Sequence, residues 1–149
     1  MKNIVFVFIL VLVGCTSTTS HSTHTLSDTM DIIKAAADSA PNGAPGTYTL
    51  QIVAGGSQGK FVYLNTEEDY RDQRAVTVAL PPSVISQLSA KYGMPPQDYF
   101  IGKKVVVNGK AQRVKIRLLS QGKPTSKYYY QTHIRVMDIS QLTILDEQA

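Results

Sequence analysis

The chain has 149 residues, of which 43% are hydrophobic and 17% charged, and its formal net charge is +4 at pH 7. This length suits one ordinary domain, and the composition excludes a globally disordered chain and a collagen-like repeat. The single cysteine excludes an internal disulfide bond and a four-cysteine zinc site.

The first fourteen residues are predicted to be a signal peptide. Lys2 supplies a positive charge, the apolar run 4–13 follows it, and the small residue Gly14 comes next. The apolar run is shorter than the roughly 20 residues that a membrane-spanning helix needs. A charge, a short apolar run and small residues in this order are typical of a secretory signal, so we expect residues 1–14 to direct export.

The end of this segment, Leu12-Val13-Gly14-Cys15, resembles the bacterial lipobox. The resemblance implies that Cys15 is lipidated and becomes the first residue of a mature, membrane-anchored lipoprotein. Thr16 rather than an aspartate follows Cys15, and by resemblance to enterobacterial sorting this favours the outer membrane over the inner membrane. The alternative is an ordinary signal peptide that is cut nearby and leaves Cys15 as a free thiol.

Residues 15–45 are expected to connect this anchor to a folded domain over residues 46–149. Serine and threonine dominate residues 16–29, and such a segment buries too little apolar surface to fold, so it predicts a flexible tether. A short helix is expected over 27–37, because serine and aspartate precede an apolar run there and proline and glycine follow it.

The domain begins with three predicted strands. Apolar and polar residues alternate over 47–52, and a second apolar run covers 61–64. A polar loop is expected over 65–74, followed by a third alternating strand over 76–80. The glycine-rich stretch 55–59 is expected to be a turn between the first two strands.

A helix is predicted after Pro81 and Pro82, which end the third strand. Apolar residues then recur at spacings of three and four up to Tyr92, and Gly93 suits the position just beyond a helix end.

Two long strands and one short strand are predicted after this helix, over 105–118, 128–137 and 142–145. The apolar residues of the first of these change parity along the strand. We therefore expect a bulge or bend between Gly109 and Arg113.

Three strands, one helix and two strands, in this order, resemble the OB-fold, a five-stranded Greek-key barrel. Segments 59–64 and 102–109 look like the second and fourth strands of that fold. The resemblance covers about residues 46–145 and implies an all-β domain with one helix. The chain is also similar to small exported bacterial lipoproteins with an OB-fold-like domain, most of them of unknown function. Another small barrel or an open antiparallel sheet with one helix is the alternative.

The chemistry-bearing motifs of common enzymes are absent from the sequence. It contains no Gly-x-Ser-x-Gly, no phosphate loop, no His-Glu-x-x-His and no paired-cysteine motif. His133 is out of phase with Ile134 and Val136, so we expect it to face outward as a surface residue rather than as a catalytic base. The sequence therefore predicts a protein that is not an enzyme and that holds no cofactor and no metal.

Four carboxylates lie in the loop between the second and third predicted strands. Their spacing does not match an EF-hand, and two arginines lie among them, so we expect a hydrated loop braced by arginine–carboxylate pairs. A metal-dependent hydrolase or nuclease is the alternative that would use these carboxylates. The four residues are Glu67, Glu68, Asp69 and Asp72.

The clearest charge feature is the segment 103–135, which holds nine lysines and arginines and no acidic residue. Alternation along a strand places the cations of 113–117 on one outward face, close to exposed tyrosines. We expect a face that binds an anionic ligand or partner of the envelope through Arg113, Lys115, Arg117, Tyr128, Tyr129 and Arg135.

Two other interpretations of this basic segment remain open. A half-buried strand needs a polar outer face in any case, so the cations could be ordinary solvated residues. Cations beside tyrosines are also typical of surfaces that bind single-stranded nucleic acid, although an envelope protein rarely meets that ligand.

Overall fold

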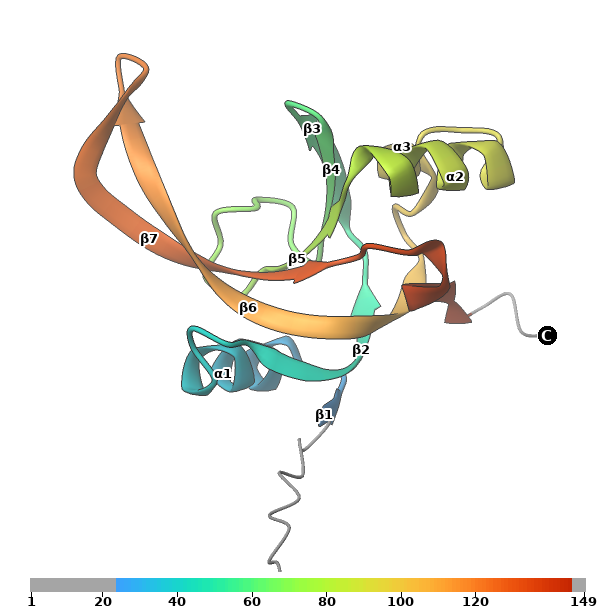
Figure 1. Cartoon of the computed structure of the whole chain (residues 1–149), viewed down its shortest axis with the longest axis horizontal. Helices are drawn as coiled ribbons and strands as arrows, with labels where there is room; N and C mark the ends of the chain where they lie inside the picture. Colours follow the sequence, from blue (N-terminus) through green and yellow to red (C-terminus); the bar gives the residue numbers. More distant parts are fainter. Residues whose placement is uncertain (1–23, 146–149) are drawn as a thin grey trace, which may run out of the picture.

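The computed structural model of the protein describes residues 24–145. The signal peptide, Cys15 and the tether up to residue 23 lie outside these described residues. The described part is mostly β-structure, with eight strands in one mixed sheet, three α-helices and one short 3-10 helix (Figure 1).

The elements follow one another along the chain with short connections, apart from the loop between β4 and β5. In chain order they are β1 (His24–Leu26), α1 (Thr29–Asp38), β2 (Ala44–Gln51), β3 (Ala54–Gln58), β4 (Phe61–Asn65), β5 (Val76–Leu80), α2 (Pro82–Tyr92), α3 (Pro96–Tyr99), β6 (Lys104–Ser120), β7 (Lys123–Arg135), η1 (Ile139–Gln141) and β8 (Leu142–Ile144).

The sheet follows the order β1-β2-β6-β7-β5-β4-β3, and β8 pairs with β6. The pairs β1–β2 and β5–β7 are parallel, and the other pairs are antiparallel. A mostly β architecture was therefore predicted correctly, but the expected five strands are eight, and the sheet is not closed into a barrel. The short β1 and β3 were missed because three to five residues carry too little periodicity, whereas β8 lies within the short final strand expected over 142–145.

The first expected strand is present as β2, but the stretch after it, expected to be a turn, forms β3, and the chain passes from one to the other at Ile52 and Val53. The backbone N–H of Ile52 donates to the carbonyl of Lys103, whereas the N–H of Val53 donates to the carbonyl of Asn65. The two residues thus bond to different neighbours. The strand changes partner here, from β6 on one side to β4 on the other.

The helix expected near residues 84–92 is confirmed as α2, and Gly93 ends it in a left-handed conformation with φ 74°. The expectation of one helix in the domain is wrong, because α3 follows directly. Pro95 caps α3 and Pro96 is its first residue. A proline is tolerated at that position, since the N–H it lacks would have no partner inside the helix.

The helix expected near residues 27–37 is present as α1, and Asp28 caps it by accepting the N–H of Met30 at 2.8 Å. Ile32 and Ala36 of this helix are fully buried in the same core as the sheet. Packing therefore begins before the domain start expected at residue 46. The end of the expected tether also forms β1, which pairs with β2.

The bulge expected between Gly109 and Arg113 is not there, because β6 is continuous and its register shift with β7 lies between Arg117 and Leu119. The change of apolar parity has another cause. Up to Ala111 the strand pairs with β2, and from Ala111 onward it pairs with β7 and extends beyond the core. There, the residues that continue the core-facing side are exposed.

The core lies on one face of β4, β5 and β7. Val62 and Leu64 of β4, Val78 of β5 and Ile134 of β7 are buried on that face. Burial of such side chains contributes about 1.5–3 kcal/mol each to the free energy of unfolding. Because successive side chains alternate across a strand, the residues between them must lie on the opposite, outer face.

Candidate functional site

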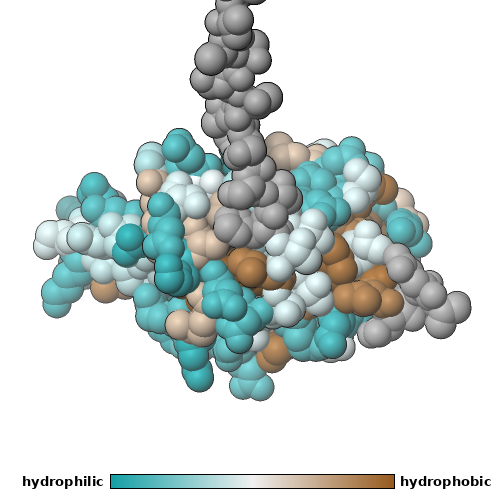
Figure 2. Space-filling view, turned by 90° about the horizontal axis from the view of Figure 1, so that it is seen from below, coloured by the Kyte–Doolittle hydropathy of each residue, from teal (hydrophilic) through white to brown (hydrophobic). Residues whose placement is uncertain are grey.

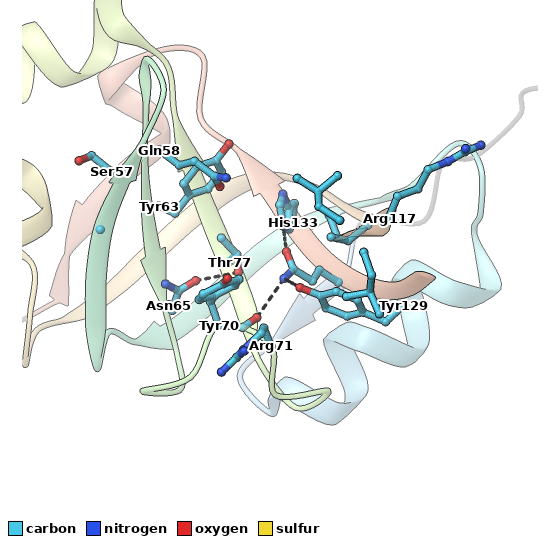
Figure 3. A pocket seen from close by; sticks show the side chains of 15 residues that line it. Ser57, Gln58, Tyr63, Asn65, Tyr70, Arg71, Thr77, Arg117, Tyr129 and His133 are labelled. Atoms are coloured by element: carbon cyan, nitrogen blue, oxygen red, sulfur yellow. Dashed lines mark hydrogen bonds between the residues drawn. The ribbon is translucent and has the colours of Figure 1, made fainter. Parts of the chain in front are cut away.

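A groove of about 600 Å³ lies on this outer face, between the β3–β4 hairpin and the long β6–β7 hairpin (Figures 1 and 3). Strands β4, β5 and β7 provide its floor, and the loop between β4 and β5 closes one side. The lining residues are Gly56, Ser57, Gln58, Tyr63, Asn65, Tyr70, Arg71, Thr77, Ile116, Arg117, Leu118, Leu119, Tyr129, Gln131 and His133.

Strand register brings the floor residues together. Tyr63 lies between the buried Val62 and Leu64, so its ring points to the outer face. Thr77 of β5 is the register partner of His133 of β7. The rings of Tyr63 and His133 are 6.0 Å apart between centroids.

Gln131 organises the polar side of the groove. Its amide nitrogen donates to the hydroxyl of Tyr129 at 2.9 Å and to the backbone carbonyl of Tyr70 at 3.1 Å. Its amide oxygen lies 2.7 Å from Nε2 of His133. Because that oxygen only accepts, His133 carries its proton on Nε2 and leaves Nδ1 as an acceptor. This network connects the β4–β5 loop to β7.

The floor of the groove is uncharged at neutral pH. Burial, together with the positive charge of Arg135, lowers the pKa of His133 to about 4. Beside it, Thr77 donates to the side-chain oxygen of Asn65 at 2.8 Å, and both residues are buried. The groove therefore presents ring faces and amide, hydroxyl and imidazole groups in fixed positions.

Charged groups lie only at the margins of the groove, and its described lining includes no carboxylate. Arg71 forms two hydrogen bonds of 3.0 Å with the Asp69 carboxylate, which neutralises its charge locally. The guanidinium of Arg117 extends away from the groove (Figure 3).

A second, smaller cavity of about 100 Å³ adjoins the groove and shares Tyr63 and His133 with it. Arg135 lines this cavity and is exposed. Within residues 24–145, no carboxylate forms an ion pair with Arg135. The composite site thus runs from a neutral groove to an unpaired guanidinium.

The six residues predicted to bind a ligand do not form one site. Tyr129 lies in the groove and Arg135 at its end, whereas the other four belong to the opposite face of the β6–β7 hairpin, since cross-strand partners share a face. Of these four, Arg117 also borders the groove, but its guanidinium extends away from it (Figure 3). We call this opposite surface the basic face; it consists of Arg113, Lys115, Arg117, Tyr128 and Tyr130.

Cations cover the tyrosine rings of the basic face. The guanidinium carbon of Arg113 lies 3.7 Å from the ring centroid of Tyr130, and the Lys115 ammonium lies 3.9 Å from that of Tyr128. The two rings pack edge to face at 5.6 Å.

Four residues of the groove were not predicted as site residues: Tyr63, Asn65, Thr77 and Gln131. A signal was present, because each of these polar or aromatic residues alternates with core residues on its strand and must face outward. No local pattern indicates that β3 and the β4–β5 loop enclose that face.

The acidic loop contains the arginine–carboxylate pairs that were expected. Arg74 binds Asp72 through two hydrogen bonds, of 3.0 and 2.7 Å, and they lower the pKa of Asp72 to about 2. Asp69 is bound by Arg71 in the same way, and its pKa is also lowered. Among the described residues, no three histidine, cysteine or acidic side chains are grouped as metal ligands would be.

No family model and no curated protein matches the chain. Among solved structures, it is similar to a chain assigned as an aspartyl-tRNA synthetase from Leishmania major Friedlin, with 13% identity and a TM-score of 0.45. The match covers 87% of this chain and 22% of that one. Within the described residues, none of the helices has both the length and the apolar character needed to cross a membrane.

Proposed function

We propose that this chain is a non-enzymatic, lipid-anchored binding protein of the bacterial envelope, and that its domain holds an anionic oligosaccharide in the groove. The observation that carries the proposal is the composition of the site. A neutral groove lined by rings and planar polar groups leads to Arg135, which is an exposed guanidinium without an ion pair in the described structure.

An OB-like arrangement supports this assignment of the site. If β2 and β3 are taken as one strand bent at Ile52 and Val53, the remaining order β6-β7-β5-β4 matches the neighbours that a five-stranded OB barrel requires. Proteins with that fold bind oligonucleotides and oligosaccharides on the face of the second and third strands. Those strands correspond to β4 and β5, which form the floor of the groove.

The side chains of the groove favour a sugar over a nucleotide. Tyr63, Tyr70 and Tyr129 provide apolar ring surface, and Gln131 and His133 provide hydrogen-bonding groups held in place by their neighbours. A small number of placed polar groups among aromatic rings is typical of ligand sites. A nucleic acid would also need cations for its phosphates, and the arginines that line the groove are either paired or directed away from it.

Arg135 is the reason why we expect the ligand to carry a negative charge. A guanidinium binds a carboxylate or phosphate group through two parallel hydrogen bonds. The Arg135 side chain is adjacent to the cavity that continues the groove, so an acidic sugar unit would reach it while a neighbouring unit occupies the groove. The uronic acids are the simplest sugars with this chemistry.

Titration calorimetry tests the proposal with the chain from residue 15 onward carrying Cys15→Ser. The probes are tetragalacturonate, neutral cellotetraose and a single-stranded oligonucleotide. We expect the acidic tetrasaccharide to bind, and Arg135→Gln to weaken it by roughly 10- to 100-fold, because a hydrogen bond to a charged group contributes about 1.5–3 kcal/mol.

Arg113→Gln is the matched control, because it removes the same charge from the opposite face of the same hairpin. It should leave the affinity for tetragalacturonate within a factor of two. An equal loss in both variants would contradict the proposed site, and binding of the oligonucleotide alone would replace the sugar by a nucleic acid.

A further inference from the structure

We infer that the basic face of the β6–β7 hairpin is a docking surface for a bilayer of anionic phospholipids. This surface lies on the opposite side of the hairpin from the groove. It is therefore a second interaction site, distinct from the proposed sugar site.

The charge of the basic face is uncompensated. Arg113, Lys115 and Arg117 are all exposed, and none of them forms an ion pair with another residue in the described structure. The segment 103–135 contains no acidic residue at all. Residues two apart on a strand are separated by about 6.8 Å, so the three cations form a row that attracts an extended anionic surface.

The tyrosines of this face are arranged for an interface rather than for stacking. Lys115 covers one face of the Tyr128 ring and Arg113 covers one face of the Tyr130 ring, which reduces the open ring surface on which nucleobases and sugar rings stack. Tyrosine is instead enriched where a protein meets lipid headgroups, because its ring is apolar and its hydroxyl is polar. Tyr128 remains 49% exposed.

The outer part of the hairpin is an open ribbon. In the described chain, no other strand pairs with β6 beyond Ala111 or with β7 before Thr132. The ribbon projects from the body of the molecule (Figure 1), and seen from below its projecting end carries mainly hydrophilic and intermediate side chains (Figure 2). Leu118 and Leu119 near its tip are also exposed. Without walls around it, the basic face fits a broad surface better than an enclosed molecule.

The proposed lipid anchor brings the hairpin close to such a surface, and this step rests on the proposed function. Eight residues lie between Cys15 and the start of β1 at His24, which makes nine Cα–Cα steps. Even fully extended, they span about 30 Å, so the domain stays within that distance of the bilayer. Because the anchor holds the domain this close to the bilayer, the effective concentration of the basic face at the lipid surface is high. A weak attraction between the basic face and anionic lipid is then sufficient to orient the domain.

Vesicle co-sedimentation tests the docking surface without the anchor, with the chain from residue 15 onward carrying Cys15→Ser. We expect binding to vesicles that contain phosphatidylglycerol, little binding to pure phosphatidylcholine, and release as the salt concentration rises. The triple variant Arg113→Gln, Lys115→Gln, Arg117→Gln should lower the partition coefficient by roughly 100-fold, since each cation near an anionic membrane contributes a factor of about 5.

The matched control is Lys60→Gln, Lys91→Gln, Lys104→Gln, which removes the same charge from exposed positions outside the basic face. Its partition coefficient should fall by less than about 5-fold, because these lysines lie away from the docked surface. An equal loss in the two triple variants would overturn the docking surface, as would equal binding to uncharged vesicles.

A fluorescence measurement removes any dependence on how well the triple variant folds. The chain contains no tryptophan, so Tyr128→Trp introduces a single reporter on the basic face, and Tyr70→Trp places one beside the groove. Only the emission of the first should shift to shorter wavelength with phosphatidylglycerol vesicles. Binding without that shift would overturn the inference, whereas Arg135→Gln should leave vesicle binding unchanged and so separates this test from that of the sugar site.

Discussion

His133 makes the stability of the protein depend on pH. Its pKa in the folded state is about 4, below the ordinary value of 6.5, because burial and Arg135 disfavour the charged imidazole. Between these two pH values the unfolded chain binds the proton more readily, so the free energy of unfolding falls as the pH is lowered. We expect a loss of up to about 3 kcal/mol from pH 7 to pH 4, measured by urea denaturation.

The variant His133→Gln isolates this effect, because its free energy of unfolding should change much less over the same pH range. The carboxylates do not obscure the comparison. The pKa of Asp72 is lowered from 3.8 to about 2, so its contribution is lost only as the pH falls below about 4. Parallel pH profiles for the wild type and the variant would show that His133 is not the responsible group.

The sequence predicts on which side of a strand a single residue lies, where strand alternation alone determines that side. The outward position of His133 follows from its phase relative to Ile134 and Val136. The bond between His133 and Gln131 lies along one strand, but its role depends on Tyr70, which is 61 residues from Gln131. No local pattern encodes such a contact, so the groove network could not be predicted.

At the scale of elements, the position of β3 depends on one glycine. A Cβ at Gly55 would lie 2.3 Å from the carbonyl oxygen of Gln97 and 2.9 Å from its Cα, both in the backbone of α3. We expect Gly55→Ala to lower the free energy of unfolding by about 1–3 kcal/mol, since strand and helix must move apart. Thermal or urea denaturation measures the change.

Gly56 is the natural control for this substitution. A Cβ at Gly56 meets no atom within 4 Å, so Gly56→Ala should change the free energy of unfolding by less than about 1 kcal/mol. If both variants were equally stable, the close packing of β3 against α3 would not be a constraint on the fold.

The same glycines explain why β3 was expected to be a turn. Glycine allows the backbone of α3 to approach the strand, but it also removes the side chains whose alternation identifies a strand. By contrast, β2, β4 and β5 carry valine, leucine or tyrosine at alternate positions and were predicted close to their observed bounds. The wall of the groove that β3 forms is therefore the part of the site that is hardest to predict from the sequence.

For the whole molecule, the central prediction concerns the anchor. We expect Cys15→Ser to abolish incorporation of labelled palmitate and to release the protein from the membrane fraction after a wash with 0.5 M salt. The wash is needed because the proposed basic face would retain some protein by charge alone, and salt screens that attraction. A variant that stays in the membrane after the wash would contradict anchoring at Cys15.

The two edges of one short segment, Val105–Val107 of β6, pair with β2 and with β8. Synthesis delivers a chain from its N-terminus, so β2 is made before its partner β6, and β6 is made before its partner β8. Such long-range pairing makes folding slow compared with the formation of local contacts. The sheet is therefore completed only when nearly all of the described chain is available, and if the chain is exported as proposed, its earlier strands remain without their partners until late in that process.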